Sequence, residues 1–224
     1  MAVLQIYDQL LQFPLFQGMS RDDLEIVAGH TRFGFTKFAA GKQIVKDGES
    51  CTQLYFLING SVRVVTASEG HDYWVVEQMS APYILQQDAV FGYHQRYTST
   101  FTALSDSNFI VIDKEEIVRL SEDFLVFRLN MLNAFATQAQ KLRRQFWRRE
   151  PESLRERVIR FFLSHCVYPA GVKEFHILMT CLADQLNDSR LNVSRVLNQL
   201  EREGLISLTR GCITIPQLER LLMQ

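Results

Sequence analysis

The alternation of apolar and polar positions divides the chain into a helical start, a strand-rich block, one long helix and a second helical region. Residues 7–30 carry apolar side chains at helical spacing, with a break at Pro14 and with Ser20 as the expected N-cap of a second short helix. Residues 32–113 consist of short runs rich in β-branched and aromatic residues, separated by glycines. This pattern predicts an antiparallel roll or barrel, in which residues 54–65 form two strands that meet as a hairpin at an Asn-Gly turn.

Residues 121–147 are expected to form one long helix with two apolar stripes. The first stripe consists of Phe124, Phe127, Met131, Phe135 and Leu142. The second consists of Leu125, Leu129, Leu132, Ala136 and Ala139. A helix that is apolar around much of its circumference must be covered on two sides. We expect one side to pack on the roll and the other to pair with the same helix of a second chain, and we assign the first stripe to this dimer interface. The alternative is a core helix of a monomer.

The segment at residues 183–204 predicts two short helices joined by a tight break, which is the pattern of a helix-turn-helix. Ala183 is small enough to let the helices approach, and Asn187 stands where the chain must turn and tolerates a left-handed backbone. Ser189 is the expected N-cap of the second helix. The buried stripe of that helix would be Val193, Val196, Leu197 and Leu200. Its opposite face carries arginines, as a reader of the DNA major groove requires, although an ordinary helical hairpin with solvated arginines is the alternative.

A hairpin is expected directly after this second helix. GLISLTRGCITI, at residues 204–215, contains two short apolar runs around a turn with glycine, and this predicts the wing of a winged helix. The side chains at its tip would reach phosphate. The residues predicted to contact DNA are Ser189, Arg190, Leu191, Asn192, Ser194, Arg195, Thr209 and Arg210.

The distribution of charge agrees with a basic C-terminal module. The chain has 224 residues, is 47% hydrophobic and carries a formal net charge of −1. Residues 1–140 hold 10 Lys and Arg against 16 Asp and Glu, a net charge of −6, whereas residues 141–224 hold 14 against 9, a net charge of +5. This asymmetry indicates an acidic domain joined to a nucleic-acid module. The cluster at the junction is either a solvated helix face or a DNA contact; it consists of Lys141, Arg143, Arg144, Arg148 and Arg149.

Several other classes of protein are not indicated. The cysteines are scattered without a CxxC pair, so we expect no zinc site, no iron–sulfur cluster and no cofactor, and we expect reduced thiols in the cytoplasm. The first twenty residues contain Asp8 and no early basic group, so no signal peptide is expected, and no apolar run is long enough to span a membrane. The His-x-His pair of a metal-dependent cupin and the usual enzyme motifs are missing, so we expect no enzyme.

In this order, the predicted elements make the chain resemble the Crp/Fnr superfamily of bacterial transcription regulators over nearly its whole length. The matching segments are FAAGKQIVKDGES (38–50), LYFLINGSVRVV (54–65), the long helix and SRLNVSRVLNQLEREGLI (189–206). The resemblance implies an α+β fold with a sensory jelly roll similar to cyclic-nucleotide-binding domains at 1–120, a dimerisation helix at 121–148 and a winged helix at 149–224. It also implies a cytoplasmic homodimer that reads a palindromic DNA operator, responds to an effector and can contact RNA polymerase.

The sequence departs from the family where cyclic nucleotides bind. Aligned without gaps through residues 97–103, the family's ribose-binding Gly-Glu pair and phosphate-binding Arg correspond to Gln86, Gln87 and Tyr97. A buried cyclic phosphate would therefore lack its cationic partner, and strand alternation sends Arg96 to the opposite face. The resemblance thus implies an effector pocket that does not bind cAMP and that contains Gln86, Gln87, Tyr97 and Thr98.

The resemblance also assigns roles in the second helix of the helix-turn-helix. Arg190 and Arg195 occupy the family's base-contacting arginine positions, and Leu191 stands where the family commonly has a glutamate. A leucine cannot accept a hydrogen bond from cytosine, but it can pack on a thymine methyl. Three alternatives stay open: a haem- or redox-dependent sensor that uses one of five histidines or Cys51, a cupin-like metal enzyme, and a signalling module that does not bind DNA.

Overall fold

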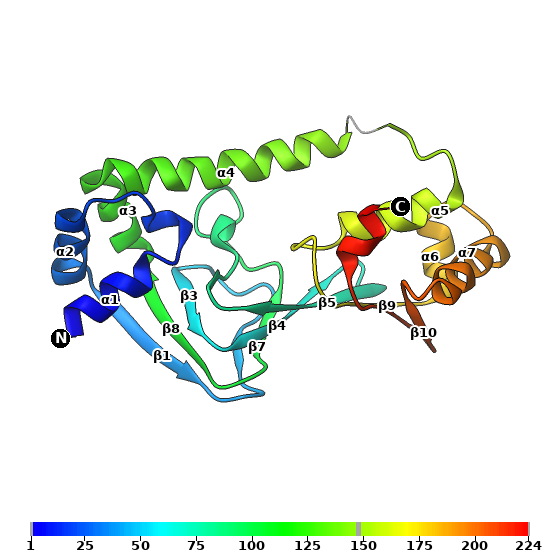
Figure 1. Ribbon diagram of the computed structural model, residues 1–224, viewed down its shortest axis with the longest axis horizontal. Helices are drawn as coiled ribbons and strands as arrows, with labels where there is room; N and C mark the ends of the chain where they lie inside the picture. Colours follow the sequence, from blue (N-terminus) through cyan, green and yellow to red (C-terminus); the bar gives the residue numbers. More distant parts are fainter. Residues whose placement is uncertain (1, 147–148, 224) are drawn as a thin grey trace. The chain divides into compact units, whose positions relative to one another are not determined.

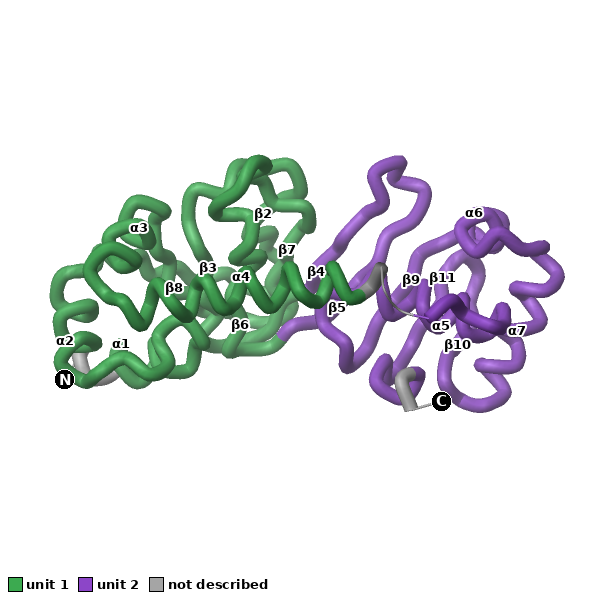
Figure 2. Tube along the Cα trace, turned by 90° about the horizontal axis from the view of Figure 1, so that it is seen from above, with its two compact units in different colours: residues 1–62, 80–148 green, residues 63–79, 149–224 purple. Residues whose placement is uncertain are grey.

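The computed structural model describes residues 2–146 and 149–223, which fall into two compact units (Figure 1, Figure 2). The N-terminal unit lies within residues 1–62 and 80–148, and the C-terminal unit lies within residues 63–79 and 149–224. Residues 63–79 come from the block that the sequence assigned to the roll, and they pack with the C-terminal unit. No helix in the described ranges is long and apolar enough to cross a membrane.

The N-terminal unit begins with short helices that follow the sequence prediction. Helix α1 covers Ala2–Leu10, a 3-10 turn covers Pro14–Phe16, and α2 covers Arg21–His30. The backbone N–H of Asp23 donates to Ser20 Oγ over 3.1 Å, so Ser20 is the N-cap of α2. The predicted break at Pro14 is confirmed.

The predicted antiparallel roll is confirmed as well. One sheet has the strand order β1-β8-β3-β6, and β2 pairs with β7 in another. The bounds are β1 Phe33–Phe38, β2 Gln43–Val45, β3 Gln53–Asn59, β6 Tyr83–Ile84, β7 Thr100–Ala103 and β8 Ser107–Asp113. Aromatic side chains fill the interior, where the rings of Phe56 and Phe13 pack edge-on with their centroids 5.1 Å apart. Such contacts stabilise the core beyond the apolar area that they bury.

The Asn-Gly turn after β3 does not make the predicted hairpin. Strand β4, Ser61–Ala67, belongs to a different sheet from β3, so the two strands are consecutive without pairing. Gly60 has a φ of +97°, and a Cβ there would lie 2.4 Å from Ser107 Oγ and 2.7 Å from the carbonyl oxygen of Asp106. The glycine lets the chain pass close beneath the start of β8 while it changes sheets. The local pattern signals the turn correctly but does not show which strands pair across it.

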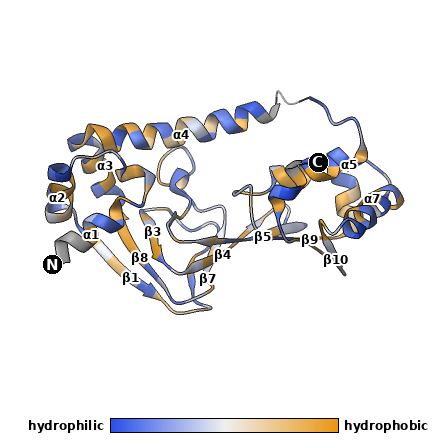
Figure 3. Cartoon of the chain, viewed as in Figure 1, coloured by the Kyte–Doolittle hydropathy of each residue, from blue (hydrophilic) through white to orange (hydrophobic). Residues whose placement is uncertain are grey.

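The long helix begins later than predicted. Helix α3 covers Lys114–Asp123 and includes Ser121, and α4 covers Leu125–Phe146. Between them, Phe124 is extended and its N–H donates to the carbonyl oxygen of Leu120, which ends α3. The hydrophobic residues of α4 lie mainly in its first half, and hydrophilic residues dominate its last turns (Figure 3). The predicted last residue, Trp147, lies outside the described residues.

The two stripes of α4 have different surroundings. Phe127 is fully buried and its ring packs on that of Phe16 at 5.1 Å, and Met131 is buried beside it. Asn130 fastens the same side, because its Nδ2 donates to the carbonyl oxygens of Leu15 and Gln17 at 3.1 and 2.7 Å. The assignment of Phe127 and Met131 to a dimer interface is therefore corrected: these side chains belong to the core of their own unit.

The second stripe is the one left uncovered in the single chain. Leu125, Leu129 and Leu132 are 57%, 47% and 57% exposed. Of the remaining residues in the first stripe, Phe124 and Phe135 are half-buried and Leu142 is exposed. The roll thus covers one side of α4 and leaves three leucines on another side.

The C-terminal unit combines helices with the strands β10, β11, β9, β5 and β4, which stand in this order at one end of a seven-stranded sheet that also contains β7 and β2. Its elements are most of β4 and of β5 Tyr73–Ser80, then α5 Leu154–Ser164, β9 Lys173–Ile177, α6 Met179–Gln185, α7 Arg190–Arg202, β10 Ser207–Thr209, β11 Cys212–Ile215 and a 3-10 segment Leu218–Met223. Phe162, Phe175 and Leu197 are among the fully buried side chains of its core. This core fixes α7 against α5, α6 and the sheet.

Candidate nucleic-acid interface

Helices α6 and α7 form the predicted helix-turn-helix. Asn187 lies in the turn with a φ of +49°, the left-handed conformation that asparagine tolerates. The backbone N–H of Asp188 donates to the carbonyl oxygen of Ala183 over 3.1 Å, and Ala183 is buried between the helices. Val193, Leu197 and Leu200 are fully buried on one face of α7. The opposite face of α7 is therefore turned outward.

The N-terminus of α7 is held by a group of short polar contacts. Ser189 Oγ accepts the backbone N–H of Asn192 over 3.2 Å, as the predicted N-cap. Asp188 accepts the side-chain amide of Asn192 over 2.9 Å and the backbone N–H of Ser189 over 2.8 Å, and it pairs with Arg157 of α5. These hydrogen bonds, that from Asn192 first, hold the pKa of Asp188 below its usual value. Ser189 and Asn192 thus hold the start of α7 in place.

The arginines at the start of α7 are differently placed. Arg190 and Arg195 are exposed, and within the described ranges no ion pair or hydrogen bond engages either guanidinium. Leu191 lies between them on the same outer surface and is 61% exposed. Ser194 is half-buried, and its Oγ lies 3.5 Å from the side-chain amide of Asn198. An exposed apolar side chain between two unpaired arginines has no role in the fold of this unit.

The wing follows as predicted. Strands β10 and β11 pair antiparallel up to Thr209 opposite Cys212, and Gly211 takes a φ of +75° in the turn. Thr209 Oγ1 donates to the carbonyl oxygen of Cys212 over 3.3 Å, so this hydroxyl stabilises the hairpin itself. Arg210 lies exposed at the tip, without a polar partner among the residues that the structure describes. It is the cation that the wing can offer to a phosphate.

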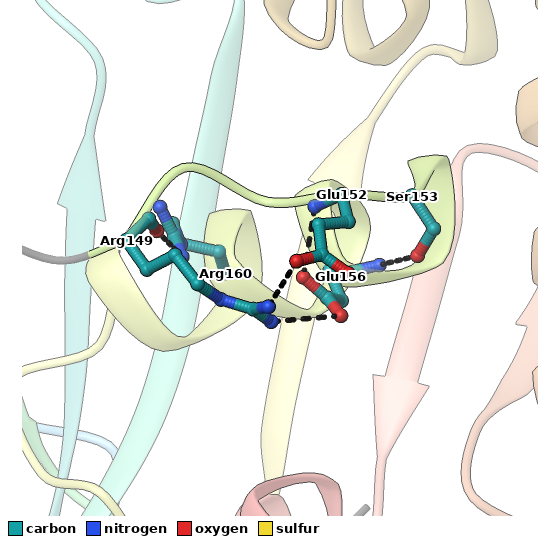
Figure 4. Close-up of polar contacts among 5 residues, drawn as sticks. All are labelled: Arg149, Glu152, Ser153, Glu156 and Arg160. Atoms are coloured by element: carbon teal, nitrogen blue, oxygen red, sulfur yellow. Dashed lines mark hydrogen bonds and ion pairs between the residues drawn. The ribbon is translucent and has the colours of Figure 1, made fainter.

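The basic cluster before α5 is only partly available. Arg149 pairs with Glu152 and Glu156, while Ser153 Oγ accepts the backbone N–H of Glu156 over 3.2 Å (Figure 4). Arg160 donates to the carbonyl oxygen of Arg149 (Figure 4). These ion pairs fasten Arg149 to the start of α5, which favours a structural role for that residue. Lys141, Arg143 and Arg144 are exposed in the last turns of α4, and Arg148 lies outside the described residues.

The predicted effector pocket contains a closed pair of side chains. Gln86 Nε2 donates to Thr98 Oγ1 over 2.8 Å, and the backbone N–H of Thr98 donates to Gln86 Oε1 over 3.0 Å. Gln86 has a left-handed backbone, and Gln87 begins the short 3-10 segment Gln87–Ala89. Both polar ends of the Gln86 amide are therefore used within the protein. A ligand at this position would have to replace two hydrogen bonds.

Tyr97, the residue before Thr98, is buried. It is 3% exposed, and its hydroxyl donates to the carbonyl oxygen of Gln53 over 3.1 Å. Burial raises its pKa far above the usual value for tyrosine, so the side chain stays neutral. Arg96 is exposed and donates to the carbonyl oxygen of Gly48 over 2.7 Å. Tyr97 is thus a core residue, which removes the support for its prediction as a ligand contact, and Arg96 is directed elsewhere.

Sequence reasoning missed the ion pairs that hold α7. Arg155 forms a bidentate pair with Glu203 at 3.0 and 2.6 Å, which ties α5 to the C-terminal end of α7. Arg157 does the same at the other end through Asp188. The partners lie 48 and 31 residues apart, so no local pattern signals them. Together they fix the recognition helix at both ends.

Comparisons with known proteins agree with this construction. The family model for the cyclic nucleotide-binding domain matches residues 35–124, and that for the Crp-like helix-turn-helix domain matches residues 156–223. The catabolite activator protein of Thermus thermophilus is 21% identical over 94% of this chain and 97% of its own, with a TM-score of 0.55. A putative Crp/Fnr-family transcriptional regulator from Eubacterium rectale is 21% identical over 95% and 97%, with a TM-score of 0.53.

The N-terminal part has its own structural match. The sensor domain of the transcriptional regulator DNR from Pseudomonas aeruginosa is 18% identical over 68% of this chain and 98% of its own, with a TM-score of 0.54. No curated protein matches the chain. At these identities the structural likeness shows the fold, and the two family models add the kind of each domain.

An antiparallel roll followed by a long helix and a winged helix with exposed arginines on its recognition helix defines a DNA-binding regulator with a cyclic-nucleotide-binding-like domain. The chain belongs to the Crp/Fnr superfamily of transcription regulators.

Proposed function

We propose that this protein is a homodimeric, cytoplasmic transcription regulator that reads an inverted-repeat operator and answers to an effector other than cAMP. The observation that carries the DNA-reading part is the start of α7, where Arg190 and Arg195 are exposed on either side of the exposed Leu191 and have no polar partner among the described residues. In the bound state, the two recognition helices would enter major grooves about 34 Å apart, one helical turn of DNA.

Each residue of this surface has a role that its chemistry allows. An arginine can donate two parallel hydrogen bonds to the O6 and N7 atoms of a guanine, and Leu191 can pack on a thymine methyl. Arg210, at the tip of the wing, would pair with phosphate, which positions the protein without reading sequence. Ser189 and Asn192 hold the start of α7 and thereby orient the arginines.

The dimer would form through α4. Leu125, Leu129 and Leu132 form an exposed apolar stripe in the first half of α4, and a second copy of the same helix would cover it. A parallel pair related by two-fold symmetry presents two identical recognition helices, which matches an inverted repeat. RNA polymerase would then be a partner of the DNA-bound dimer.

The absence of a response to cAMP follows from charge and from hydrogen bonding. The position of the family's phosphate-binding arginine is Tyr97, which is buried and neutral. The amide of Gln86 is already paired with Thr98. A cyclic phosphate would lose its hydration without gaining a cationic partner there, and a ligand that scarcely binds cannot shift a conformational equilibrium.

Selection of bound duplexes from a random DNA library tests the readout. We expect the wild type to select an inverted repeat and Arg195→Ala to lose about 1–3 kcal/mol of specific binding with a relaxed preference at one base pair per half-site. Arg202→Ala is the matched control, because it removes the same charge from the far end of α7. An unchanged preference in Arg195→Ala would rule out the assigned contact.

Calorimetry with cAMP and cGMP at up to millimolar ligand tests the effector part separately. We expect no saturable heat for either nucleotide with the full-length protein. Micromolar binding that also tightens the selected duplex would overturn this part and would bring Arg96 forward as the phosphate partner.

A further inference from the structure

One β-hairpin leaves the N-terminal unit and packs with the C-terminal unit. Residues 63–79, here called the docking hairpin, include most of β4 and β5 and group with residues 149–224 (Figure 2). Strand β5 pairs antiparallel with β9 over five positions, from Tyr73 opposite Ile177 to Glu77 opposite Lys173. In the strand order β10-β11-β9-β5, the hairpin takes the edge of β9 that faces away from the wing. It is a strand addition to the winged-helix sheet.

Side chains fasten this added strand on both of its faces. Val75 enters the hydrophobic core of the unit and is 3% exposed. On the other face, the ring of Trp74 stacks on that of His176, with centroids 5.0 Å apart and planes 9° apart. Tyr73 Oη lies within hydrogen-bond distance, 3.0 Å, of His165 Nε2 at the end of α5. The hairpin is therefore packed as part of this domain and not laid on its surface.

A buried ion pair closes the contact. Glu77 is 1% exposed and Lys173 fully buried, and Glu77 Oε1 lies 2.9 Å from Lys173 Nζ. The carboxylate also accepts the backbone N–H groups of Val167 and Tyr168 over 2.8 and 3.1 Å. All three donors come from the C-terminal segment of the chain, and the acceptor comes from the hairpin. Such a buried pair specifies one register of docking, because separating it leaves a charge buried without its partner.

We infer that the docking hairpin is a positioning device, held by the Glu77–Lys173 pair, through which the N-terminal unit controls where the winged helix is held. The hairpin continues into Val62 and Ser80 of the N-terminal unit, so the chain connects the two units at three places: 62/63, 79/80 and 148/149. With the hairpin docked, the winged helix is joined to the N-terminal unit through both ends of the hairpin besides the segment after α4. This inference rests on the proposed DNA reading by a dimer, because a restrained winged helix loses less freedom on binding two half-sites.

The docked state is compatible with DNA binding. The hairpin pairs with the side of β9 opposite to β11, away from the wing, and the outer face of α7 remains exposed with the hairpin in place. Docking therefore favours operator binding, and release of the hairpin weakens it. The ion pair between Glu77 and Lys173 selects a single register of β5 against β9.

The test uses Glu77→Gln in the full-length protein, with Glu69→Gln in the exposed turn of the same hairpin as the matched control. We expect Glu77→Gln to raise hydrogen exchange in β5 at least tenfold while exchange in α7 stays as in the wild type. Affinity for the duplex selected by the wild type should fall by about tenfold or more, and the double variant Glu77→Gln with Lys173→Met should recover both. Wild-type exchange in β5, or equal loosening of β5 and α7, would overturn the inference.

A second variant keeps the test decisive if Glu77→Gln fails to fold. Trp74→Cys with His176→Cys places two thiols at directly opposite positions of β5 and β9, and Cys212→Ser removes the neighbouring native thiol. The oxidised protein should bind the selected duplex at least as tightly as its reduced form. A tenfold loss on oxidation, reversed by dithiothreitol, would overturn the inference. If wild-type protein selects no DNA sequence, the proposed function fails, while the exchange measurement still reports on the hairpin.

Discussion

The outer leucines of α4 give the most quantitative test of the dimer. Leu125, Leu129 and Leu132 are each about half exposed. Full burial of a leucine contributes about 1.5–3 kcal/mol, so covering the exposed half contributes about 1 kcal/mol per side chain. A symmetric pair buries each leucine twice, which amounts to about 6 kcal/mol for the stripe before the entropic cost of association is subtracted. The stripe therefore contributes appreciably to the free energy of dimer association, and a single substitution can disrupt it.

Leu129→Asp removes two of these burials, about 2 kcal/mol, and places two carboxylates near the symmetry axis. Since about 1.4 kcal/mol corresponds to a factor of ten, we expect the dimer dissociation constant to rise by about 30-fold or more. Sedimentation equilibrium over a range of protein concentrations measures this constant directly. Binding to the selected duplex should fall in parallel, because only the dimer contacts both half-sites.

Two comparison variants locate the effect. Leu104→Asp makes the same change at another exposed leucine of the N-terminal unit and should leave the dissociation constant unchanged. Phe127→Leu alters the buried stripe, so it should lower the melting temperature without weakening association. A wild-type dissociation constant for Leu129→Asp, or equal weakening by both aspartates, would refute the assignment of the outer stripe.

Two further predictions concern local chemistry. Gly60→Ala puts a Cβ 2.4 Å from Ser107 Oγ at a φ of +97°, so it should lower the free energy of unfolding, measured by thermal melts, by more than about 1 kcal/mol. Gly29→Ala in α2 has open space for its Cβ and should raise the free energy of unfolding by up to about 1 kcal/mol. Effects of the same sign in the two variants would contradict this prediction. Burial raises the pKa of the Cys166 thiol to about 12, so only about 10⁻⁴ of the thiol is ionised at pH 8. Alkylation of Cys166, followed by mass spectrometry, should therefore be roughly a thousandfold slower in the folded protein than in the unfolded protein. Comparable alkylation rates would exclude this protonation state.

The sequence predicted correctly those caps and turns that depend only on neighbouring residues. Ser20 and Ser189 cap helices through bonds to backbone N–H groups three residues away, and Asn187 and Gly211 take the left-handed backbones that their turns require. These interactions form within a few residues, so they can be read along the chain. The helix-turn-helix, its wing and the start of the reading helix follow from such signals.

The pairing of distant segments could not be predicted in this way. The turn at Gly60 is visible in the sequence, but β3 pairs with β8 some fifty residues later and not with β4. The break at Phe124 arises where α3 ends and α4 turns toward the segment around Leu15. Apolar spacing indicates that a helix face is buried but does not show which segment covers it. For this reason the pattern alone wrongly assigns Phe127 and Met131 to the dimer interface, whereas both side chains lie in the core of their own unit.

The sequence by itself predicted the strand-rich roll, the helix-turn-helix with its wing, the N-caps Ser20 and Ser189 and the arginines of the reading helix. Only the tertiary structure decided that Tyr97 is buried, that Gln86 is closed on Thr98 and that Arg157 holds Asp188 at the start of α7. It alone joined Glu77 to Lys173 across 96 positions of the chain. The physical reason is that backbone propensity and capping act between near neighbours, whereas burial and charge pairing depend on which distant residues the fold brings together.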